Sequence, residues 1–344
     1  MPCGVLLLGM GGPESLDEVR PFLRALFQDN DIVPLPFGPR VQRAFGWLVS
    51  ALRAPKAKRF YAALGGLSPQ RRTSEAQARA LSRRLDLEAS TCAPWRSYLA
   101  FRYARPLTDE ALEAARLDGV NRLFVLPLYP QYSMVTTGSS LRELDRGFRR
   151  IGWRPREVVT IRDYCDDERY VAALATSVAR TLGELGPRDR AEALLLFSAH
   201  ALPMRVVRRG DPYPEQVEAT IRAVVARLGE AAPPHVLCYQ SQARPFVRWI
   251  GPRTDETIER LAREGSKVMV VVPVSFVAEH VETLYEIDVL YAELARKSGV
   301  RVFRRTPALG EDTQFVGALA AIVLRAAGLE PHAAPEQVRG AEKP

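Results

Sequence analysis

The sequence predicts an α/β protein made of two open lobes, each with a four-stranded parallel sheet flanked by helices. Short apolar runs rich in Val, Leu and Ile alternate with amphipathic helical patterns, as in parallel sheets covered on both faces. Four such runs precede residue 165 and four follow it. A chain of 344 residues is also long enough to bury the cores of two lobes of similar size.

Each predicted element follows from its local pattern. The first lobe is expected over 1–165, with strands at 4–8, 95–101, 121–127 and 157–161 and helices at 14–27 and 108–117. The second lobe is expected over 166–330, with strands at 192–198, 235–240, 267–273 and 300–304 and helices at 214–228, 255–264 and 282–299. The polar tail at 331–344 is rich in Pro and Ala, which predicts mobility.

Composition narrows the class of protein. Hydrophobic residues make up 47% and charged residues 26% of the chain, as in ordinary globular proteins. No apolar stretch approaches the roughly 20 residues that span a bilayer, and the first residues read as a strand rather than a signal peptide. We therefore expect a cytoplasmic protein. Its cysteines lie far apart without CxxC spacing, which predicts free thiols rather than a zinc or iron–sulfur site: Cys3, Cys92, Cys165 and Cys238.

The net charge of +8 is concentrated in one segment. Residues 32–74 contain no acid but eight basic residues, namely Arg40, Arg43, Arg53, Lys56, Lys58, Arg59, Arg71 and Arg72. The rest of the chain is near neutral, which argues against a nucleic-acid binder. Within this segment a helical stripe of apolar residues lies close to Trp47: Val41, Phe45, Leu48 and Leu52. Such a basic amphipathic helix is typical of a membrane interface, although an ordinary helix covering a cleft would show the same pattern.

Chemistry is expected where strands end, because ligands of open α/β sheets bind beyond the carboxyl ends of the strands. Gly, His, aromatic and polar residues gather there in GMGGPES, YPQYSMVTTGSS, SAHALPM, QSQARPFVRWIGP and SFVAEHVETLYEID. His200 ends an apolar strand and suits a general base, although a histidine bound to a loop would look the same. Ser198 lies two residues earlier but has no GxSxG elbow around it.

The stretch after the strand at 267–273 carries His280 and several acids. Glu279, Glu282 and Glu286 share a helical face, so they form either a solvated surface or a proton-transfer or transient metal site. The spacing is not HExxH and no cysteine lies nearby, which argues against a permanent zinc. Nitrogen and oxygen ligands alone suit a divalent metal that comes and goes.

These motifs together resemble those of ferrochelatases, which insert ferrous iron into a porphyrin. The matching stretches span nearly the whole chain in family order: LLLGMGGPESLDEVRPFLRALFQDND, GGLSP, FRYARPLTDEAL, YPQYSMVTTGSSL, SAHALPMRVVRRGDPYP, QSQARPFVRWIGPRTDETI and FVAEHVETLYEID. The resemblance implies a chelatase-like fold of two Rossmann-like lobes with a porphyrin cleft between them. Residues 32–74 would then form a lip of that cleft, and the amphipathic pattern predicts that Phe45, Trp47 and Leu48 of this lip contact the inner face of the cytoplasmic membrane.

The resemblance assigns roles to individual residues. His200 and Glu282 correspond to the family's catalytic pair and to transient ligands of Fe²⁺, with His280 and Glu286 in a supporting polar line. Residues at the family's macrocycle positions are Met10, Tyr61, Arg102, Tyr103, Ser139 and Trp249. No permanent cofactor is implied, because Met134 stands where cluster-bearing members have a cysteine and no cysteine follows Cys238.

The resemblance by itself does not distinguish between two porphyrin substrates, protoporphyrin IX and coproporphyrin III. Coproporphyrin-type members resemble a Tyr-Gly-Thr-Pro pattern where this chain has Met10-Gly11-Gly12-Pro13. Together with the apolar lip, this favours protoporphyrin IX over coproporphyrin III. The same motifs are compatible with a cobalt chelatase of tetrapyrrole synthesis and with a non-catalytic tetrapyrrole carrier, although the presence of His200 and Glu282 argues against the carrier.

Overall fold

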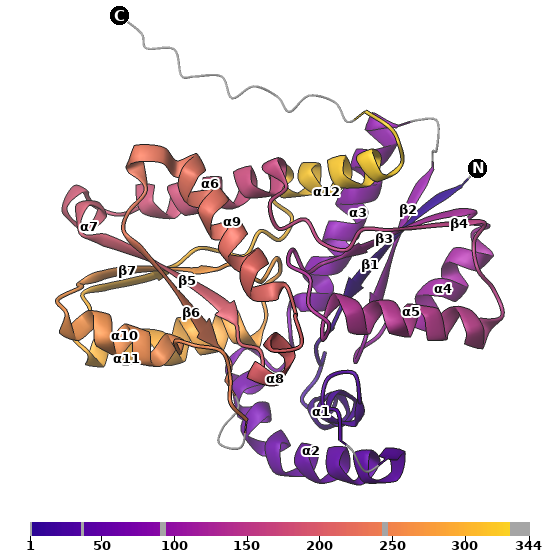
Figure 1. Ribbon diagram of the computed structural model, residues 1–344, viewed down its shortest axis with the longest axis horizontal. Helices are drawn as coiled ribbons and strands as arrows, with labels where there is room; N and C mark the ends of the chain where they lie inside the picture. Colours follow the sequence, from indigo (N-terminus) through magenta and orange to yellow (C-terminus); the bar gives the residue numbers. More distant parts are fainter. Residues whose placement is uncertain (1, 36–37, 90–93, 243–246, 331–344) are drawn as a thin grey trace, which may run out of the picture.

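The computed structural model describes residues 2–35, 38–89, 94–242 and 247–330 (Figure 1). Within these residues the strands form two four-stranded parallel sheets, ordered β2-β1-β3-β4 and β6-β5-β7-β8. Helices cover both sheets, so the predicted two-lobed α/β architecture is confirmed. The predicted tail 331–344 and Cys92 lie outside the described residues.

The N-terminal lobe follows the predicted order of elements. It contains β1 (Cys3–Gly9), α1 (Val19–Gln28), α2 (Gly38–Ala63), α3 (Gln70–Glu88), β2 (Trp95–Phe101), α4 (Thr108–Leu117), β3 (Arg122–Pro127), α5 (Thr137–Ile151) and β4 (Glu157–Thr160). The helix predicted from residue 14 begins only at Val19. Residues before it form a turn in which the backbone N–H of Glu14 donates to the carboxylate of Glu18, at 2.8 Å.

The C-terminal lobe repeats the same strand order. It contains α6 (Glu168–Gly183), α7 (Pro187–Ala191), β5 (Ala193–His200), α8 (Met204–Val207), α9 (Tyr213–Leu228), the short turn η2 (Gly229–Ala231), β6 (His235–Gln240), α10 (Thr254–Arg263), β7 (Val268–Pro273), the π-helix η3 (Glu282–Tyr291), α11 (Ala292–Lys297), β8 (Val302–Arg305) and α12 (Thr313–Ala326). The predicted helix at 282–299 is therefore present, but its first ten residues are wound as a π-helix rather than an α-helix.

The cores form because side chains of each central strand alternate between the two faces of its sheet. In β1, Leu6 and Leu8 pack with α4 and α5, whereas Val5 and Leu7 pack with α3 on the other face. In β5, Leu196 faces α10 and α11, and its neighbours face α6 and α9. Burial on both faces explains why the strands are apolar without interruption.

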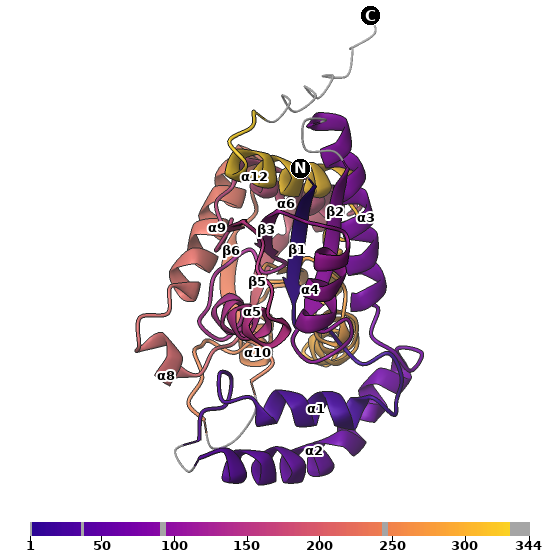
Figure 2. The same ribbon diagram turned by 90° about the vertical axis from the view of Figure 1, so that its right-hand side faces the viewer.

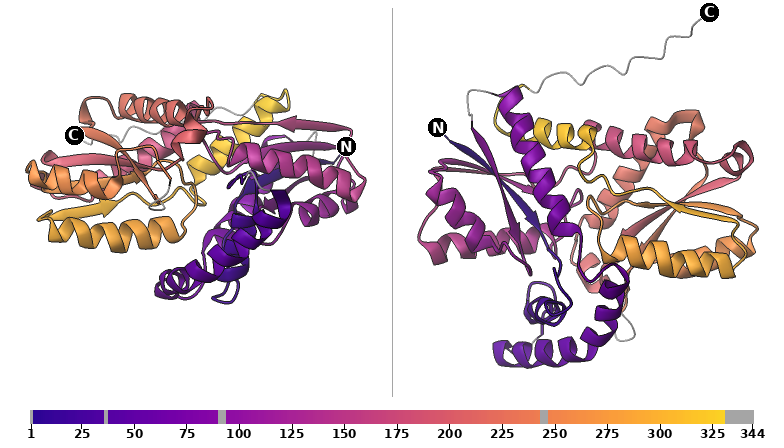
Figure 3. Two further views of the ribbon diagram at one scale, coloured as in Figure 1. Left: turned by 60° about the horizontal axis from the view of Figure 1, so that its bottom comes forward. Right: turned by 180° about the vertical axis from the view of Figure 1, so that it is seen from behind.

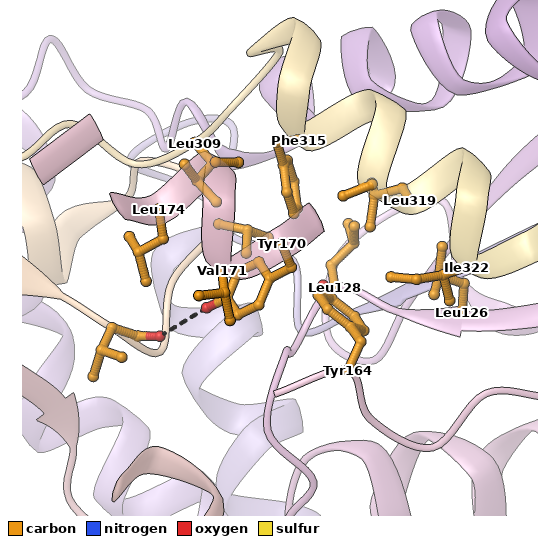
Figure 4. Packing of buried hydrophobic residues seen from close by; sticks show 14 of the residues in the cluster. Leu126, Leu128, Tyr164, Tyr170, Val171, Leu174, Leu309, Phe315, Leu319 and Ile322 are labelled. Atoms are coloured by element: carbon orange, nitrogen blue, oxygen red, sulfur yellow. Dashed lines mark hydrogen bonds between the residues drawn. The ribbon is translucent and has the colours of Figure 1, made fainter. Parts of the chain in front are cut away.

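Helix α12 connects the two lobes. It packs against α6 of the C-terminal lobe and against α3 of the N-terminal lobe (Figures 1 and 4). Its Phe315 contacts Tyr170 of α6 edge-on, with ring centroids 6.3 Å apart. One buried apolar cluster consequently runs through both lobes. The division of the chain at residue 165 stays a prediction, with α12 shared by both halves.

Helices α1 and α2 lie beneath the lobes, where they form the region predicted as the lip (Figure 2). They approach each other closely at Gly46, where a Cβ would lie 3.0 Å from the backbone nitrogen of Gln28. Helix α2 changes direction toward the C-terminal lobe (Figure 3), and Pro55, which lies inside it, interrupts the helical hydrogen bonds. Among the described residues, no helix has the length and hydropathy needed to cross a membrane.

Candidate active site

The candidate site lies at the carboxyl edge of the C-terminal sheet. His200 is the last residue of β5, and the segment leading to Glu282 follows β7, the neighbour of β5. In a sheet of this order the chain passes from β5 to β6 on one side and then crosses back from β6 to β7 on the other side of β5, which makes the edge between β5 and β7 a topological switch point. Both predicted catalytic residues therefore lie at strand ends, as expected, and the structure brings them together at one edge of the same sheet.

His200 and Glu282 are in direct contact. The Nδ1 atom of His200 lies 2.8 Å from Oε2 of Glu282, and their side chains are 37% and 28% exposed. Burial alone would raise the pKa of Glu282, but the charge of His200 and its hydrogen bond outweigh burial and lower the pKa. Burial would likewise lower the pKa of His200, and Glu282 raises it instead. The pair therefore favours a carboxylate beside an imidazole that binds protons readily.

Glu286 lies beside this pair, and Ser241 connects the two acids. The hydroxyl of Ser241 contacts Oε2 of Glu282 at 2.8 Å and also Oε2 of Glu286. The backbone N–H of Ser241 donates to Oε1 of Glu286 at 2.9 Å. Burial and the charge of Glu282 raise the pKa of Glu286. We call His200, Ser241, Glu282 and Glu286 the polar line.

Ser241 joins two acids whose pKa values shift in opposite directions. A serine hydroxyl carries one hydrogen, yet the Ser241 oxygen contacts two carboxyl groups. It can therefore donate to only one of them at a time. The pKa of Glu282 is lowered and that of Glu286 is raised, so Glu286 takes up a proton more readily than Glu282 does.

The π-helical winding of η3 places these acids. The backbone N–H of Ala292 donates to the carbonyl of Ile287, five residues earlier, as in a π-helix. Residues five apart are then one turn apart, and the hydroxyl of Tyr291 donates to Glu286 at 2.7 Å. Gln240 supports the start of η3, because its amide donates to the carbonyl of Glu282 at 2.9 Å. The opposite end of that amide accepts a hydrogen bond from buried Ser198 at 2.7 Å.

The remaining acids of this stretch have a different environment. Arg305 lies 2.8 Å from both Glu279 and Asp288. Burial would raise the pKa of Glu279, but the charge of Arg305 and hydrogen bonds outweigh it and lower the pKa. The sequence pattern grouped Glu279 with Glu282 and Glu286, but in the structure Glu279 forms an ion pair with Arg305. Its role is to hold the segment against β8.

His280 lies close enough to Glu282 and His200 to interact with both electrostatically, but its ring takes no part in the hydrogen bonds of the polar line. Its ring lies edge-on to Phe276, with centroids 4.4 Å apart, and its buried Nδ1 has no hydrogen-bond partner among the described residues. Burial lowers the pKa of His280, whereas Glu282 raises the pKa of His200. The role predicted for His280 stays a prediction.

The C-terminal end of α2, which belongs to the N-terminal lobe, contacts η3 next to the polar line. Phe60 stacks on Tyr285 of η3 with ring centroids 4.5 Å apart. Tyr61 is buried, and burial together with the negative charge of Glu282 raises its pKa. The predicted macrocycle residue Tyr61 therefore lies within electrostatic reach of Glu282. Met10 follows β1 at the facing sheet edge and accepts a hydrogen bond from the backbone of Tyr103 at 3.1 Å.

Arg102, Tyr103 and Ser139 belong to a network of ion pairs. The side chain of Arg102 is 7% exposed and contacts Asp29, lies 3.0 Å from Glu143, and donates to Ser139 at 3.2 Å. The hydroxyl of Tyr103 donates to the same Asp29 at 2.6 Å. Arg146 continues the network to Glu143 and Asp31, each at 2.8 Å. We call Asp29, Asp31, Arg102, Glu143 and Arg146 the arginine clamp.

The clamp fixes α1 to the lobe. Asp29 and Asp31 follow α1, whereas Arg102 follows β2 and the other members lie on α5. The guanidinium of Arg102 is thus compensated by acids of this chain, which leaves less of its charge for a ligand carboxylate. Trp249 pairs its backbone with Pro203 beside α8 and packs against the core. The macrocycle roles predicted for these residues stay predictions.

The predicted lip residues differ in exposure. Trp47 and Leu48 are 55% and 54% exposed, whereas Phe45 is partly buried edge-on to Phe27 of α1 at 6.5 Å. The buried face of α2 is small and polar: Gln42, Gly46, Ser50 and Ala54. The apolar side of this helix, including Leu52, therefore faces solvent.

Sequence reasoning missed Ser241, Gln240 and Asp29. The first two close the strand β6 and begin the motif QSQARPFVRWIGP, which attracted attention only for its aromatic residues. Their position at a strand end was the available signal. Asp29 gave no signal, because its partner Arg102 is 73 residues away in the chain.

Comparison with known proteins adds independent information. The model of the family described as Ferrochelatase matches residues 2–327. A ferrochelatase of Synechococcus sp. (strain JA-3-3Ab) is 45% identical over 322 residues, which cover 93% of this chain and 92% of that protein. The mitochondrial ferrochelatase of Xenopus laevis is 40% identical, over 93% of this chain and 77% of that protein. The solved structure of SirB from Bacillus subtilis with Fe³⁺ superposes with a TM-score of 0.54 at 12% identity, covering 95% and 96% of the two chains, which shows a shared fold.

Proposed function

Because the chain belongs to the ferrochelatase family, and is thus a lyase that inserts metal into a porphyrin, we propose that it inserts Fe²⁺ into protoporphyrin IX. The observation that carries this proposal is the polar line, in which two acids meet one imidazole at the switch-point edge. Protoporphyrin rather than coproporphyrin is supported by Met10-Gly11-Gly12-Pro13 after β1 and by the apolar exposed side of α2.

His200 is the proposed proton acceptor. Insertion exchanges two pyrrole N–H protons for Fe²⁺, so a base must face the macrocycle nitrogens. Nδ1 of His200 is occupied by Glu282, which leaves Nε2 as the ring nitrogen for a pyrrole proton. The Glu282 carboxylate stabilises the imidazolium that forms, as an acid behind a catalytic histidine does. Each proton then leaves along the polar line or to solvent, and Fe²⁺ takes its place on the four nitrogens.

The same two groups are also proposed as transient ligands of the metal. Imidazole nitrogen and carboxylate oxygen suit a divalent ion that must be released, whereas thiolates would retain it. Glu282 and Glu286 have no lysine or arginine partner among the described residues, so no basic side chain competes with a metal cation for their carboxyl oxygens. Fe²⁺ enters this scheme as a substrate.

The choice of substrates is tested by following porphyrin absorbance during metal insertion. Initial rates with Fe²⁺ are compared for protoporphyrin IX and coproporphyrin III, and Co²⁺ is run in parallel. We expect the highest kcat/KM for Fe²⁺ with protoporphyrin IX. A preference for coproporphyrin III, or for Co²⁺, would overturn the proposed substrate, and H200A serves as the control for non-enzymatic insertion.

We also propose that α2 contacts a membrane surface peripherally. Trp47, Leu48 and Leu52 are exposed on α2, with Leu52 72% exposed, and Arg40 and Arg43 lie on the same helix. Basic helices with an exposed apolar side bind at the headgroup region of anionic membranes. We expect W47S/L48S to lose binding to anionic liposomes in a sedimentation assay. Leu117 of α4 is similarly exposed, at 73%, and L117S should bind as the wild type does; equal binding by all three proteins would refute the contact.

Finally, we propose that the enzyme works without a permanent cofactor. Support comes from Met134 in the motif YPQYSM and from the scattered thiols of Cys3, Cys165 and Cys238, each buried at a different position. Metal and acid-labile sulfide analysis of the purified protein should find neither in stoichiometric amount. Stoichiometric iron together with sulfide would contradict the proposal.

A further inference from the structure

Ser241 has an unusual backbone conformation. Its φ is +62°, and within the described residues it is the non-glycine residue with a positive φ. Side chains with a Cβ rarely adopt this left-handed region, because the Cβ approaches the following carbonyl. Glycine would occupy the position at lower conformational cost. The presence of a serine at this position, directly after β6, therefore indicates that its hydroxyl has a function that glycine could not supply.

The conformation places two donors of Ser241 against the same pair of acids. The hydroxyl reaches Glu282 at 2.8 Å as well as Glu286, and the backbone N–H reaches Glu286 at 2.9 Å. Gln240, the residue before it, holds the backbone of Glu282. One bend at the end of β6 thus fixes both ends of the acid pair. Outside this bend, His200 and Tyr291 each hold one of the acids.

Without this hydroxyl the acid pair would be unstable in its observed position. Two carboxyl groups brought together under partial burial repel each other when both are ionised. Among the described residues, no arginine or lysine compensates them, in contrast to Glu279 and Asp288 beside Arg305. The Ser241 hydroxyl is the neutral group between them. Its removal would free Glu282 to rotate away from Nδ1 of His200.

We propose that Ser241 is a positioning residue for metal insertion, which uses its left-handed backbone and its hydroxyl to hold Glu282 in line with His200. The inference rests on the proposed function of His200 as the proton acceptor. Ser241 acts on the reaction through its contact with Glu282. It should therefore affect the rate of the insertion step while leaving the binding of porphyrin unchanged.

Two substitutions separate the hydroxyl from the backbone. S241G removes the hydroxyl, keeps the N–H bond to Glu286 and relieves the positive φ. S241T keeps a hydroxyl but adds a β-branch at a backbone conformation that such residues avoid. A purely structural residue would give activity that follows stability. The proposed role predicts that activity and stability move in opposite directions.

The measurements are kcat, KM for porphyrin and the temperature of unfolding. For S241G we expect a loss of kcat of about 10- to 100-fold, the effect of one hydrogen bond to a charged group, with unchanged KM and an equal or higher unfolding temperature. For S241T we expect recovery of most of kcat at a lower unfolding temperature. Full kcat in S241G would overturn the proposal, and this result can be read even if S241T does not fold.

Failure of this inference can be distinguished from failure of the proposed function. H200A is measured in the same assay, with whichever metal and porphyrin the wild type turns over fastest. If H200A retains the wild-type rate, His200 is not the proton acceptor, and the positioning role of Ser241, which depends on His200, is wrong as well. If H200A is inactive while S241G keeps full kcat, only the role of Ser241 is wrong. Porphyrin binding, followed by quenching of protein fluorescence, should be equal in S241G and wild type.

Discussion

The arginine clamp and the polar line use similar residues to opposite effect. Both gather partly buried charges at the carboxyl edge of a parallel sheet, one in each lobe. In the clamp, burial would raise the pKa values of Asp31 and Glu143, but hydrogen bonds from arginines outweigh it and lower both. In the polar line, burial and a neighbouring carboxylate raise the pKa of Glu286.

The difference lies in the counter-charge. An acid held by guanidinium groups stays ionised over the whole physiological range, so it holds elements together and exchanges no protons. Glu286, held by hydroxyls beside a second carboxylate, binds a proton more readily than an ordinary carboxylate does. The same contrast recurs within one stretch, where Arg305 compensates Glu279 and Asp288 but not Glu282. The presence of arginine therefore separates structural acids from reactive ones here.

The largest expected effect comes from removing the imidazole. H200A should lower kcat for iron insertion by about 10²- to 10⁴-fold, since it removes the general base and the hydrogen-bond partner of Glu282. Stopped-flow absorbance at saturating porphyrin measures this loss. A rate within the range of the wild type would show that a group other than His200 accepts the pyrrole protons.

Replacing Glu286, the acid of the polar line with the raised pKa, should have a smaller effect. E286Q removes the ionisable group but keeps a polar amide of nearly the same shape beside Ser241. We expect kcat to fall by about tenfold or less, in the range of one altered hydrogen bond. E286D, which shortens the side chain but keeps the carboxyl, is the matched control. A collapse of activity in E286Q would mean that Glu286 must ionise during turnover.

A substitution in the arginine clamp should change the free energy of unfolding rather than the rate of metal insertion. D31N should lower the free energy of unfolding by about 1–3 kcal/mol at pH 7, between the values for exposed and buried ion pairs. Because the folded-state pKa of Asp31 lies below its ordinary value, the stabilisation is complete above that ordinary value. It is lost as the pH falls through the folded-state pKa.

Urea unfolding of D31N and wild type over a pH series tests this linkage. The difference in unfolding free energy should be constant near neutral pH and should shrink below pH about 4, where the unfolded Asp31 becomes protonated. A difference that grows on acidification would show that the clamp does not hold Asp31 as an ion.

The smallest expected effect lies where the lip meets the site. F60A removes the stack of Phe60 on Tyr285, one of the contacts that join α2 to η3. Aromatic pairs contribute about 0.5–1.5 kcal/mol beyond buried area, so KM for porphyrin should rise by a few fold with little change in kcat. A loss of kcat alone would show that the stack positions the acids of η3 instead.

The two sheets could be predicted from the sequence because their strands are buried on both faces and therefore read as apolar runs. His200 and Glu282 could be placed at strand ends for the same reason. Their contact could not, because it depends on how the first turn of η3 is wound. A π-helix of this length is too short to produce a recognisable periodicity of apolar residues in the sequence, so its winding could not be predicted.

Other features depend on long-range geometry. Ser241 becomes conspicuous only through its φ, which no residue pattern encodes. The compensation of Glu279 depends on Arg305, 26 residues away on the neighbouring strand β8. The apolar stripe of α2 could be recognised in the sequence. Its exposure to solvent could not, because it follows from the close packing of α1 against the opposite face of α2 at Gly46.

The central claim is that the acids without arginine partners carry the chemistry, and one pair of rates tests it most directly. E282Q and D288N replace two acids of the same π-helix, one facing His200 and one held by Arg305. Measured by Fe²⁺ insertion at saturating porphyrin, E282Q should lose about 100-fold or more in kcat, whereas D288N should stay within about twofold of wild type. Equal losses in the two variants, or a wild-type rate in E282Q, would contradict the account.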